Sequence, residues 1–205
     1  KLKKRGQCTK RDGKGQHHWL ELDNNPSEKY FSKMFSKKII YSEIVQKQQF
    51  SIENKNYCID MTGFIITGEN LKYLTALLNS NPVTFFFKKF YMGTELGSKG
   101  FRYKKTFLEL LPISQISKEK QKPFEILVDY ILFAKEQDMK KEASLFESVI
   151  DGLVYDLYFP DDMKKADCFI SDEVLKLVKE FDKTTTMIQN IYKIFNENKT
   201  IQRGL

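Results

Sequence analysis

Hydrophobic positions in the first third of the chain predict a set of short β-strands. β-branched and aromatic residues dominate the run at 37–45, and the Asn54-Lys55-Asn56 turn separates two stretches that favour a hairpin. Polar segments bound most of these runs, as expected where strands end at loops. The predicted strands are residues 18–22, 37–45, 50–53, 57–60 and 63–67.

The hydrophobic period changes at residue 71, where apolar positions begin to recur on one helical face: Leu71, Leu74, Leu77 and Leu78. Asn81 followed by Pro82 predicts the cap and first position of a second helix, which Gly93 would end. The stretch 107–113 then returns the chain to the core. The second helix carries four phenylalanines whose spacing favours core positions for most of them: Phe85, Phe86, Phe87 and Phe90.

The second half of the chain reads as helical. Residues 114–122 are rich in Ser, Lys and Gln and predict a linker that closes at Pro123. Ser171 is the expected cap of a third helix that includes Phe181, and residues 184–198 predict a fourth. Two earlier apolar stripes are expected to pack on each other: Phe124, Leu127, Val128, Ile131 and Leu132, and Phe146, Val149, Ile150, Leu153 and Leu157.

These patterns predict an α/β fold with two parts. Residues 1–116 form an α/β domain with a mixed or antiparallel sheet and two helices. Residues 117–205 form a mainly α-helical region that braces the first part or docks it to other domains. A chain of 205 residues with 41% hydrophobic residues is long and apolar enough to bury a core of its own.

Charge is distributed unevenly between the two parts. Residues 1–113 hold 20 Lys and Arg against 10 Asp and Glu, whereas residues 114–205 hold 14 against 17. The basic part is therefore the candidate nucleic-acid surface. Solvated lysine-rich faces that bind nothing remain an alternative explanation of the same charge.

Cysteine usage and hydropathy point to a cytoplasmic protein. Cys8, Cys58 and Cys168 are too far apart for a zinc site or a disulfide framework. No apolar run reaches the length of about 18 residues that a membrane span needs, and no signal peptide opens the chain. Because the sequence starts inside a basic stretch at Lys1, we expect it to be part of a longer protein.

The stretch 93–105 is the most informative segment. It places three glycines, four cations and two aromatic residues within thirteen positions. Glycines allow a backbone to approach a phosphate closely, and Lys and Arg supply the charge that nucleic acid attracts. The segment follows two strongly apolar stretches that can hold it in place. We therefore interpret it as a DNA-facing loop on a recognition domain.

Catalytic, cofactor and metal motifs are missing from the sequence, so we predict no enzyme activity for this chain. Asn25-Pro26-Ser27 lacks the second proline and the aromatic residue that amine methylation needs. The stretch 93–99 differs from a phosphate loop in length, in residue order and in following a helix. His17 and His18 would point to opposite faces of a strand and could not share a metal ion.

Four blocks in series resemble the C-terminal target-recognition region of Type IIG restriction–modification enzymes and adenine-specific DNA methyltransferases. They are Arg11-Asp12-Gly13-Lys14-Gly15 with His18-Trp19-Leu20-Glu21-Leu22, then Lys37-Lys38-Ile39-Ile40-Tyr41-Ser42-Glu43-Ile44, then Phe64 to Leu74, and finally Gly97-Ser98-Lys99-Gly100-Phe101-Arg102-Tyr103-Lys104-Lys105 running into Phe107 to Ile113. Together they span residues 11–113. Ser42 departs from the proline that is usual in the family, which we expect to affect a strand edge.

The resemblance implies that this region performs no chemistry and instead holds the duplex and selects the sequence. Upstream domains of the same polypeptide would methylate a flipped adenine with S-adenosylmethionine and cleave the DNA. The expected partner is double-stranded DNA, with no membrane. No cofactor is expected in this chain, whereas S-adenosylmethionine and Mg²⁺ are expected in the parent enzyme.

The candidate DNA contacts lie in two groups that would flank one groove. Arg102 is the first choice for a base contact, because its planar fork suits guanine O6 and N7. The competing interpretation pairs Arg102 with a carboxylate such as Glu95 or Glu109. Among the aromatic residues, Tyr103 is the surface candidate, whereas Tyr41 and Trp19 favour the core. The full set is Lys3, Lys4, Arg5, Lys10, Arg11, Lys14, Lys99, Arg102, Tyr103, Lys104 and Lys105.

Three other functions compete with a non-enzymatic recognition module. Half of a Type I restriction specificity subunit would need a second recognition domain, for which the remaining residues are too few. A small stand-alone enzyme would need paired acid/base groups or metal ligands. A protein–protein scaffold with a solvated basic half would have no salt-dependent DNA affinity.

Overall fold

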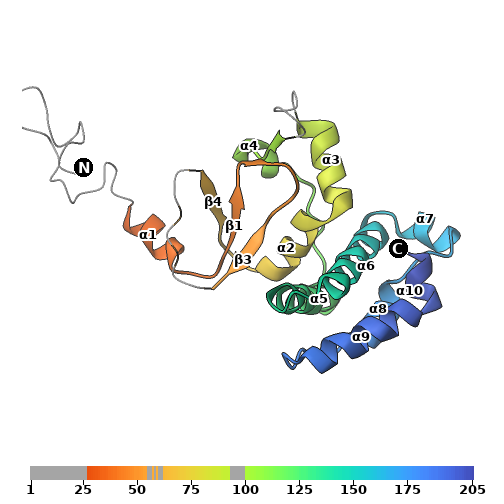
Figure 1. The fold of residues 1–205 in the computed structure, drawn as a ribbon. Coiled ribbons are helices and arrows are strands. Elements are labelled where there is room, and N and C mark those ends of the chain that lie inside the picture. Colours follow the sequence, from red (N-terminus) through yellow and green to blue (C-terminus); the bar gives the residue numbers. More distant parts are fainter. Residues whose placement is uncertain (1–26, 55–56, 58, 60–61, 93–99) are drawn as a thin grey trace, which may run out of the picture.

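The computed structural model describes residues 27–205 except 55–56, 58, 60–61 and 93–99. Small antiparallel sheets and short helices make up the N-terminal half, and helices make up the C-terminal half (Figure 1). The predicted fold class, an α/β part followed by a mainly helical region, is confirmed.

A three-stranded antiparallel sheet forms the centre of the N-terminal half. β1 (Lys38–Ser42) lies between β3 (Ser51–Glu53) and β4 (Gly63–Ile66). Ile39 of β1 stands opposite Ile52 on one side and Ile66 on the other, so these apolar side chains share one face. Ile39 is fully buried, and this face therefore contributes to the core.

A second, two-stranded ribbon branches from this sheet. The backbone bends at Glu43, after which β2 (Ile44–Val45) pairs antiparallel with β5 (Phe101–Arg102). The predicted strand at 37–45 is thus present but split in two. Ser42, where the family usually has a proline, is the last residue of β1, the central strand of the sheet. Its expected effect on a strand edge stays a prediction.

The expected hairpin around residues 54–56 is wrong for the part that the structure describes. Ser51–Glu53 pairs with Lys38–Ile40 of β1 instead. Tyr57 and Ile59, the described residues of the expected partner strand, belong to no strand. The apolar face shared with β1 determines the pairing of β3, whereas the local turn signal does not.

Four helices accompany the sheet in the described part of the N-terminal half. They are α1 (Glu28–Met34), α2 (Leu71–Asn79), α3 (Asn81–Tyr91) and α4 (Lys105–Leu108). The periodicity predicts α2 and α3 correctly but not the short α1 and α4. The expected cap Asn81 is wrong by one position, because Ser80 caps α3 and its hydroxyl accepts from the Val83 amide.

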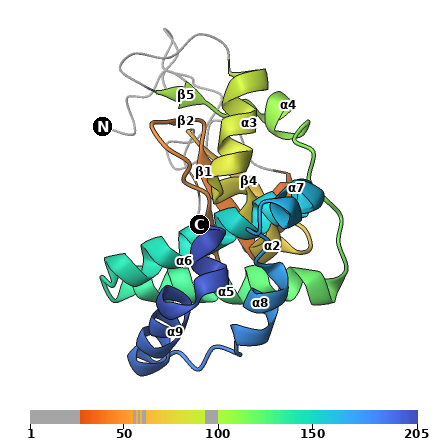
Figure 2. The same cartoon turned by 90° about the vertical axis from the view of Figure 1, so that its right-hand side faces the viewer.

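The C-terminal half is built on two long helices, α5 (Lys118–Glu136) and α6 (Lys140–Tyr158), which pack on each other as predicted. Smaller helices complete this half on the side away from the sheet (Figures 1 and 2). They are α7 (Pro160–Lys165), α8 (Ser171–Leu177), α9 (Thr185–Glu197) and α10 (Lys199–Arg203).

Two boundary predictions in this half are wrong. The linker at 114–122 does not reach Pro123, because α5 already begins at Lys118 and contains the proline. Lys118 to Lys122 are mostly exposed and polar, so the start of this helix carries little apolar signal. Ser171 is the first residue of α8 and not its cap, and α8 ends before Phe181.

One continuous core crosses the predicted boundary between residues 116 and 117. The Tyr73 ring of α2 packs edge-on against Phe124 of α5, with 5.3 Å between ring centroids. Asp151 of α6 accepts from the Asn81 amide at the start of α3, at 2.8 Å. The division into domains at 1–116 and 117–205 stays a prediction, but the two parts share their apolar interior.

We predict that Leu127→Ala in α5 lowers the free energy of unfolding by about 2–5 kcal/mol, because the fully buried side chain leaves a cavity. Leu175→Ala on the exposed face of α8 is the matched control and should change it by less than about 0.5 kcal/mol. Urea denaturation followed by circular dichroism measures both. Because the core is shared, a single transition is expected; separate transitions for the two halves would contradict it.

Asp156 of α6 anchors the start of α8. Its Oδ2 accepts from the backbone amides of Ile170 and Ser171, at 2.8 and 2.7 Å, and from the Ser171 hydroxyl at 2.7 Å. Oδ1 is buried with no hydrogen-bond partner among the described residues. Burial disfavours the charged form and raises the pKa of Asp156 above its ordinary value, although the three donors act in the opposite direction.

We predict that the stability of the wild-type protein relative to Asp156→Asn falls as the pH rises. A raised pKa in the folded state means that folding favours the protonated carboxyl. This contribution is therefore full below the ordinary value of 3.8 and is lost as the pH rises through the folded-state pKa. Urea denaturation of both proteins between pH 4 and 7 tests this, and parallel pH profiles would contradict it.

Candidate DNA interface

The side chains of Phe101, Arg102 and Tyr103 alternate across the β2–β5 ribbon. Phe101 and Tyr103 are buried, whereas Arg102 between them keeps 47% of its side chain exposed. Successive residues of an extended chain point to opposite faces, so burial of the two rings turns the guanidinium outward. The prediction that Arg102 is accessible to a ligand is therefore compatible with the structure.

Glu43 holds Arg102 through two nearly parallel contacts. Arg102 Nε lies 2.8 Å from Glu43 Oε1, and Arg102 Nη2 donates to Glu43 Oε2 at 3.0 Å. This hydrogen bonding raises the pKa of Arg102 further above its already high ordinary value. Sequence reasoning anticipated a carboxylate partner but named Glu95 or Glu109. Glu109 pairs instead with Lys105, at 3.6 Å, and Glu95 lies outside the described residues.

An aromatic cluster beneath the ribbon fixes its inner face. The Tyr103 ring lies 5.0 Å from Phe101, 4.9 Å from Phe50 and 4.6 Å from Phe87 between centroids. The Asn79 side chain bonds both the amide and the carbonyl of Phe50, which fixes that residue in the cluster. Aromatic pairs at such separations stabilise the fold by more than the burial of their apolar area alone. The cluster therefore supports the inner face of the ribbon.

Tyr103 occupies a buried position and not the surface position that the neighbouring cations suggest. Only 2% of the residue is exposed. Burial raises the pKa of its phenol to about 12, while the nearby Thr84 hydroxyl acts in the opposite direction. Neither hydroxyl has a hydrogen-bond partner of standard geometry among the described residues. The assignment of Tyr103 as an accessible DNA contact is thus corrected: its ring supports the ribbon from within.

Lys104 and Lys105 follow the ribbon directly, and both are exposed. The Lys105 ion pair with Glu109 joins two side chains that are more than 60% exposed, so it can exchange easily with another anion. Lys104 lies 5.8 Å from the centre of the Phe107 ring. Both ammonium groups are therefore accessible to a ligand such as phosphate.

The other predicted contacts lie outside the described residues, and their assignment stays a prediction. They are Lys3, Lys4, Arg5, Lys10, Arg11, Lys14 and Lys99, and the histidines at 17 and 18 and Trp19 belong to the same range. Tyr41 is buried, as expected.

Sequence reasoning missed three residues beside Arg102. Glu43 is its partner across 59 positions of sequence, and no local pattern could reveal that pairing. Ile44 stands directly opposite Arg102 on the ribbon with 62% of its surface exposed. Lys88, in the last turn of α3, places its ammonium 4.3 Å from the Phe101 ring centre. A cation in the last turn of a helix next to the basic stretch is a signal that could have identified Lys88.

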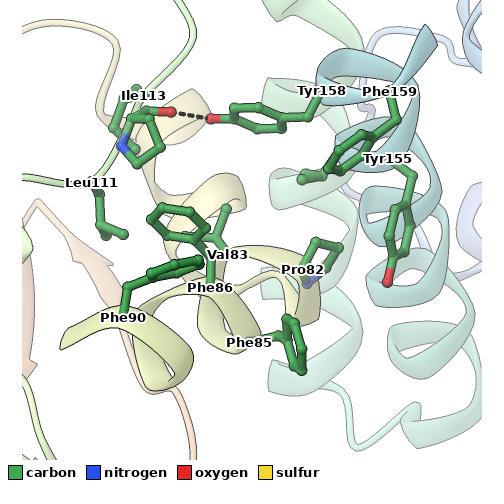
Figure 3. A pocket seen from close by; sticks show the side chains of 12 residues that line it. Pro82, Val83, Phe85, Phe86, Phe90, Leu111, Ile113, Tyr155, Tyr158 and Phe159 are labelled. Atoms are coloured by element: carbon green, nitrogen blue, oxygen red, sulfur yellow. Dashed lines mark hydrogen bonds between the residues drawn. The ribbon is translucent and has the colours of Figure 1, made fainter. Parts of the chain in front are cut away.

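A separate apolar hollow of about 420 Å³ opens between α3, the end of α6 and residues 111–113 (Figure 3). Phe86 and Phe90 line one side, and Tyr155, Tyr158 and Phe159 line the other. Tyr158 donates to the Pro112 carbonyl at 2.6 Å and so fixes the upper edge. Its lining offers few polar groups for a phosphate or a base edge.

The expected core positions of the four phenylalanines are therefore right only in part. Phe87 is fully buried, but Phe85 and Phe90 are 69% and 66% exposed. Only one face of α3 packs against α2 and α6, so the remaining aromatic side chains lie along the hollow or in solvent.

Two kinds of feature are missing from the described part of the chain. No three His, Cys, Asp or Glu side chains there are grouped to hold a metal ion. None of its helices has both the length and the apolar character needed to cross a membrane.

Residues 9–113, about half of the chain, match the family model of the TaqI-like C-terminal specificity domain. The matched range contains the sheet, the ribbon and helices α1 to α4, and it ends just before α5. No curated protein and no solved structure matches the chain. The match confirms the resemblance carried by the four sequence blocks and supports a role in DNA sequence specificity.

We predict that Tyr103→Phe leaves DNA affinity unchanged, because the hydroxyl is buried and cannot reach a ligand. Its free energy of unfolding should stay the same or rise, since the hydroxyl completes no standard hydrogen bond. Titration of a fluorescent duplex measures the first quantity and urea denaturation the second. If Tyr103→Phe remains folded but binds DNA more weakly, the Tyr103 hydroxyl contacts DNA after all and the correction is wrong.

Proposed function

The chain belongs to the TaqI-like C-terminal specificity domain family, and from this membership we propose that it binds duplex DNA and selects the sequence on which a restriction–modification enzyme acts. It serves as the recognition module and performs no chemistry itself. Upstream domains of the same polypeptide supply adenine methylation, with S-adenosylmethionine, and Mg²⁺-dependent cleavage. The complete enzyme acts in the cytoplasm.

One observation carries the proposal for this particular surface: a single arginine stands outward on a rigid ribbon with two exposed lysines directly after it. Arg102 is anchored by Glu43 and supported by buried rings, whereas Lys104 and Lys105 are exposed cations with looser contacts. Rigid placement suits base reading, because hydrogen bonds to base edges require fixed directions. Exposed lysines suit phosphate, which accepts a cation from many directions.

The helical half supports this function by bracing the recognition half. α5 and α6 pack against α2 and α3, and α3 in turn carries Phe87 beneath Tyr103. A displacement of α3 would therefore move the support of Arg102.

We predict steep salt dependence of DNA binding that weakens when a phosphate-binding lysine is removed. Lys104→Ala and Lys105→Ala should each lower affinity for all sequences alike and reduce the slope of log K against log salt by about 1. Lys140→Ala in α6 removes another exposed, ion-paired lysine, from the helical half, and is the matched control. Fluorescence anisotropy with a random-sequence duplex between 50 and 300 mM NaCl measures the slopes.

Selection of a random duplex library by the wild-type chain tests the specificity part of the proposal. An enriched motif is expected, and Arg102→Ala should lose the preference at one base pair, with about tenfold or greater loss of affinity for the motif. Binding without a motif would assign specificity to the complete enzyme only. Absence of binding at low salt would instead favour a protein scaffold.

A further inference from the structure

We infer that Glu43 is a positioning residue that aims Arg102 at guanine, and that Ile44 contacts the methyl group of thymine in the adjacent base pair, with the β2–β5 ribbon lying in the major groove. The inference rests on the proposed DNA-binding function and deepens it. It predicts that the recognised site contains a G·C pair next to an A·T pair.

The first support is the edge of the guanidinium that Glu43 occupies. Its two carboxylate oxygens engage Nε and Nη2, at 2.8 and 3.0 Å, which form the side edge of the group. Among the described residues, no hydrogen bond or ion pair engages the end edge, which is formed by Nη1 and the second proton of Nη2. That edge supplies two parallel donors, the pattern that guanine O6 and N7 accept.

The second support is the register of the ribbon. Ile44 and Arg102 stand directly opposite each other, so their side chains leave the same face with Cβ atoms about 4.5–5.5 Å apart. Neighbouring base pairs are separated by about 3.4 Å, so the two side chains can reach successive base pairs. A two-stranded ribbon fits the width of the major groove, where the thymine methyl is accessible to an apolar side chain.

The third support is the exposure of Ile44. At 62% exposed, it is an apolar side chain held in solvent beside a charged pair, on a ribbon whose neighbouring residues Val45 and Phe101 are buried. Contact with a thymine methyl would remove this apolar surface from water. The opposite face of the ribbon is not available to DNA, because Phe101 on that face packs into the aromatic cluster.

Charge gives the fourth support. Glu43 neutralises Arg102, so the pair contributes little to attraction by phosphate, which depends on uncompensated cations. Without Glu43, Arg102 would become a free cation that can rotate toward the nearest phosphate. Glu43 thus favours base reading over phosphate binding by orientation and by charge.

A purely structural role for Glu43 is the competing explanation. The Glu43 backbone already takes part in the ribbon, since the Tyr103 amide donates to its carbonyl at 2.7 Å. If the carboxylate only stabilised the bend, its loss would lower stability or overall affinity but would leave the base preference unchanged. Base preference is therefore the readout that separates the two roles.

The decisive experiment selects one random duplex library in parallel with the wild-type chain, Glu43→Gln and Glu147→Gln. Glu147→Gln removes the same charge from an exposed ion pair with Lys135 in the helical half and should reproduce the wild-type motif. Glu43→Gln should lose the guanine preference at one position by about tenfold, while its affinity for unrelated duplex DNA rises above that of Glu147→Gln because Arg102 becomes a free cation. Thermal unfolding confirms that the variants are folded.

Base analogues test the same contacts from the DNA side. In the enriched duplex, 7-deazaguanine at that position removes N7 and should weaken wild-type binding far more than it weakens Glu43→Gln. Uracil in place of the neighbouring thymine removes the methyl group and should weaken the wild-type chain by a few-fold, but it should leave Ile44→Ala unaffected.

The outcomes distinguish failure of the inference from failure of the function. A folded wild-type chain that enriches no motif would overturn the proposed specificity and the inference with it. A wild-type motif that lacks an adjacent guanine and thymine, or one that Glu43→Gln retains in full, would overturn the inference alone. If uracil weakens binding by wild type and by Ile44→Ala equally, the proposed contact between Ile44 and the thymine methyl is contradicted.

Discussion

The burial of Phe101 and Tyr103 on either side of Arg102 is the constraint on which the candidate interface depends. Both rings belong to one cluster with Phe50 and Phe87, and centroids within this cluster lie about 5 Å apart. In an extended strand, a shift by one residue would exchange the inner and outer positions and bury the guanidinium. The cost of burying an unpaired charge excludes that register, so the hydrophobic core determines which way the arginine points.

The helical half contributes to this burial indirectly, by fixing the helix that carries Phe87. Asp151 of α6 accepts from the Asn81 amide at 2.8 Å and from its side-chain amide at 2.7 Å, and so fixes the beginning of α3. Phe87, two turns further along α3, lies beneath Tyr103. A rigid path therefore runs from α6 through α3 to the ribbon. The helical half therefore supports, through α3, the ribbon that carries the proposed recognition residue Arg102.

Much of this architecture was predictable, but the decisive pairing was not. Apolar periodicity locates α2, α3, α5, α6 and α9, because each helix buries one face, and β-branched composition locates β1 and β4. The cations at 102–105 were also identified, yet Tyr103 was misplaced, because local charge outweighed strand alternation in that prediction. The Glu43 contact depends on how β2 and β5 pair across 59 residues, a tertiary outcome without a local signature.

In the proposed interface, affinity and specificity would depend on how the charge of each cation is compensated. Arg102 is held by a carboxylate in two contacts at 2.8 and 3.0 Å, whereas Lys105 has a looser 3.6 Å pair between highly exposed side chains. A loosely paired cation moves readily to phosphate and attracts any duplex, and salt screens that attraction. A tightly paired arginine gains less from phosphate and more from a base edge that matches its remaining donors. In the proposed interface, a tightly paired arginine close in sequence to a loosely paired lysine would allow one surface to hold every duplex weakly and one sequence strongly.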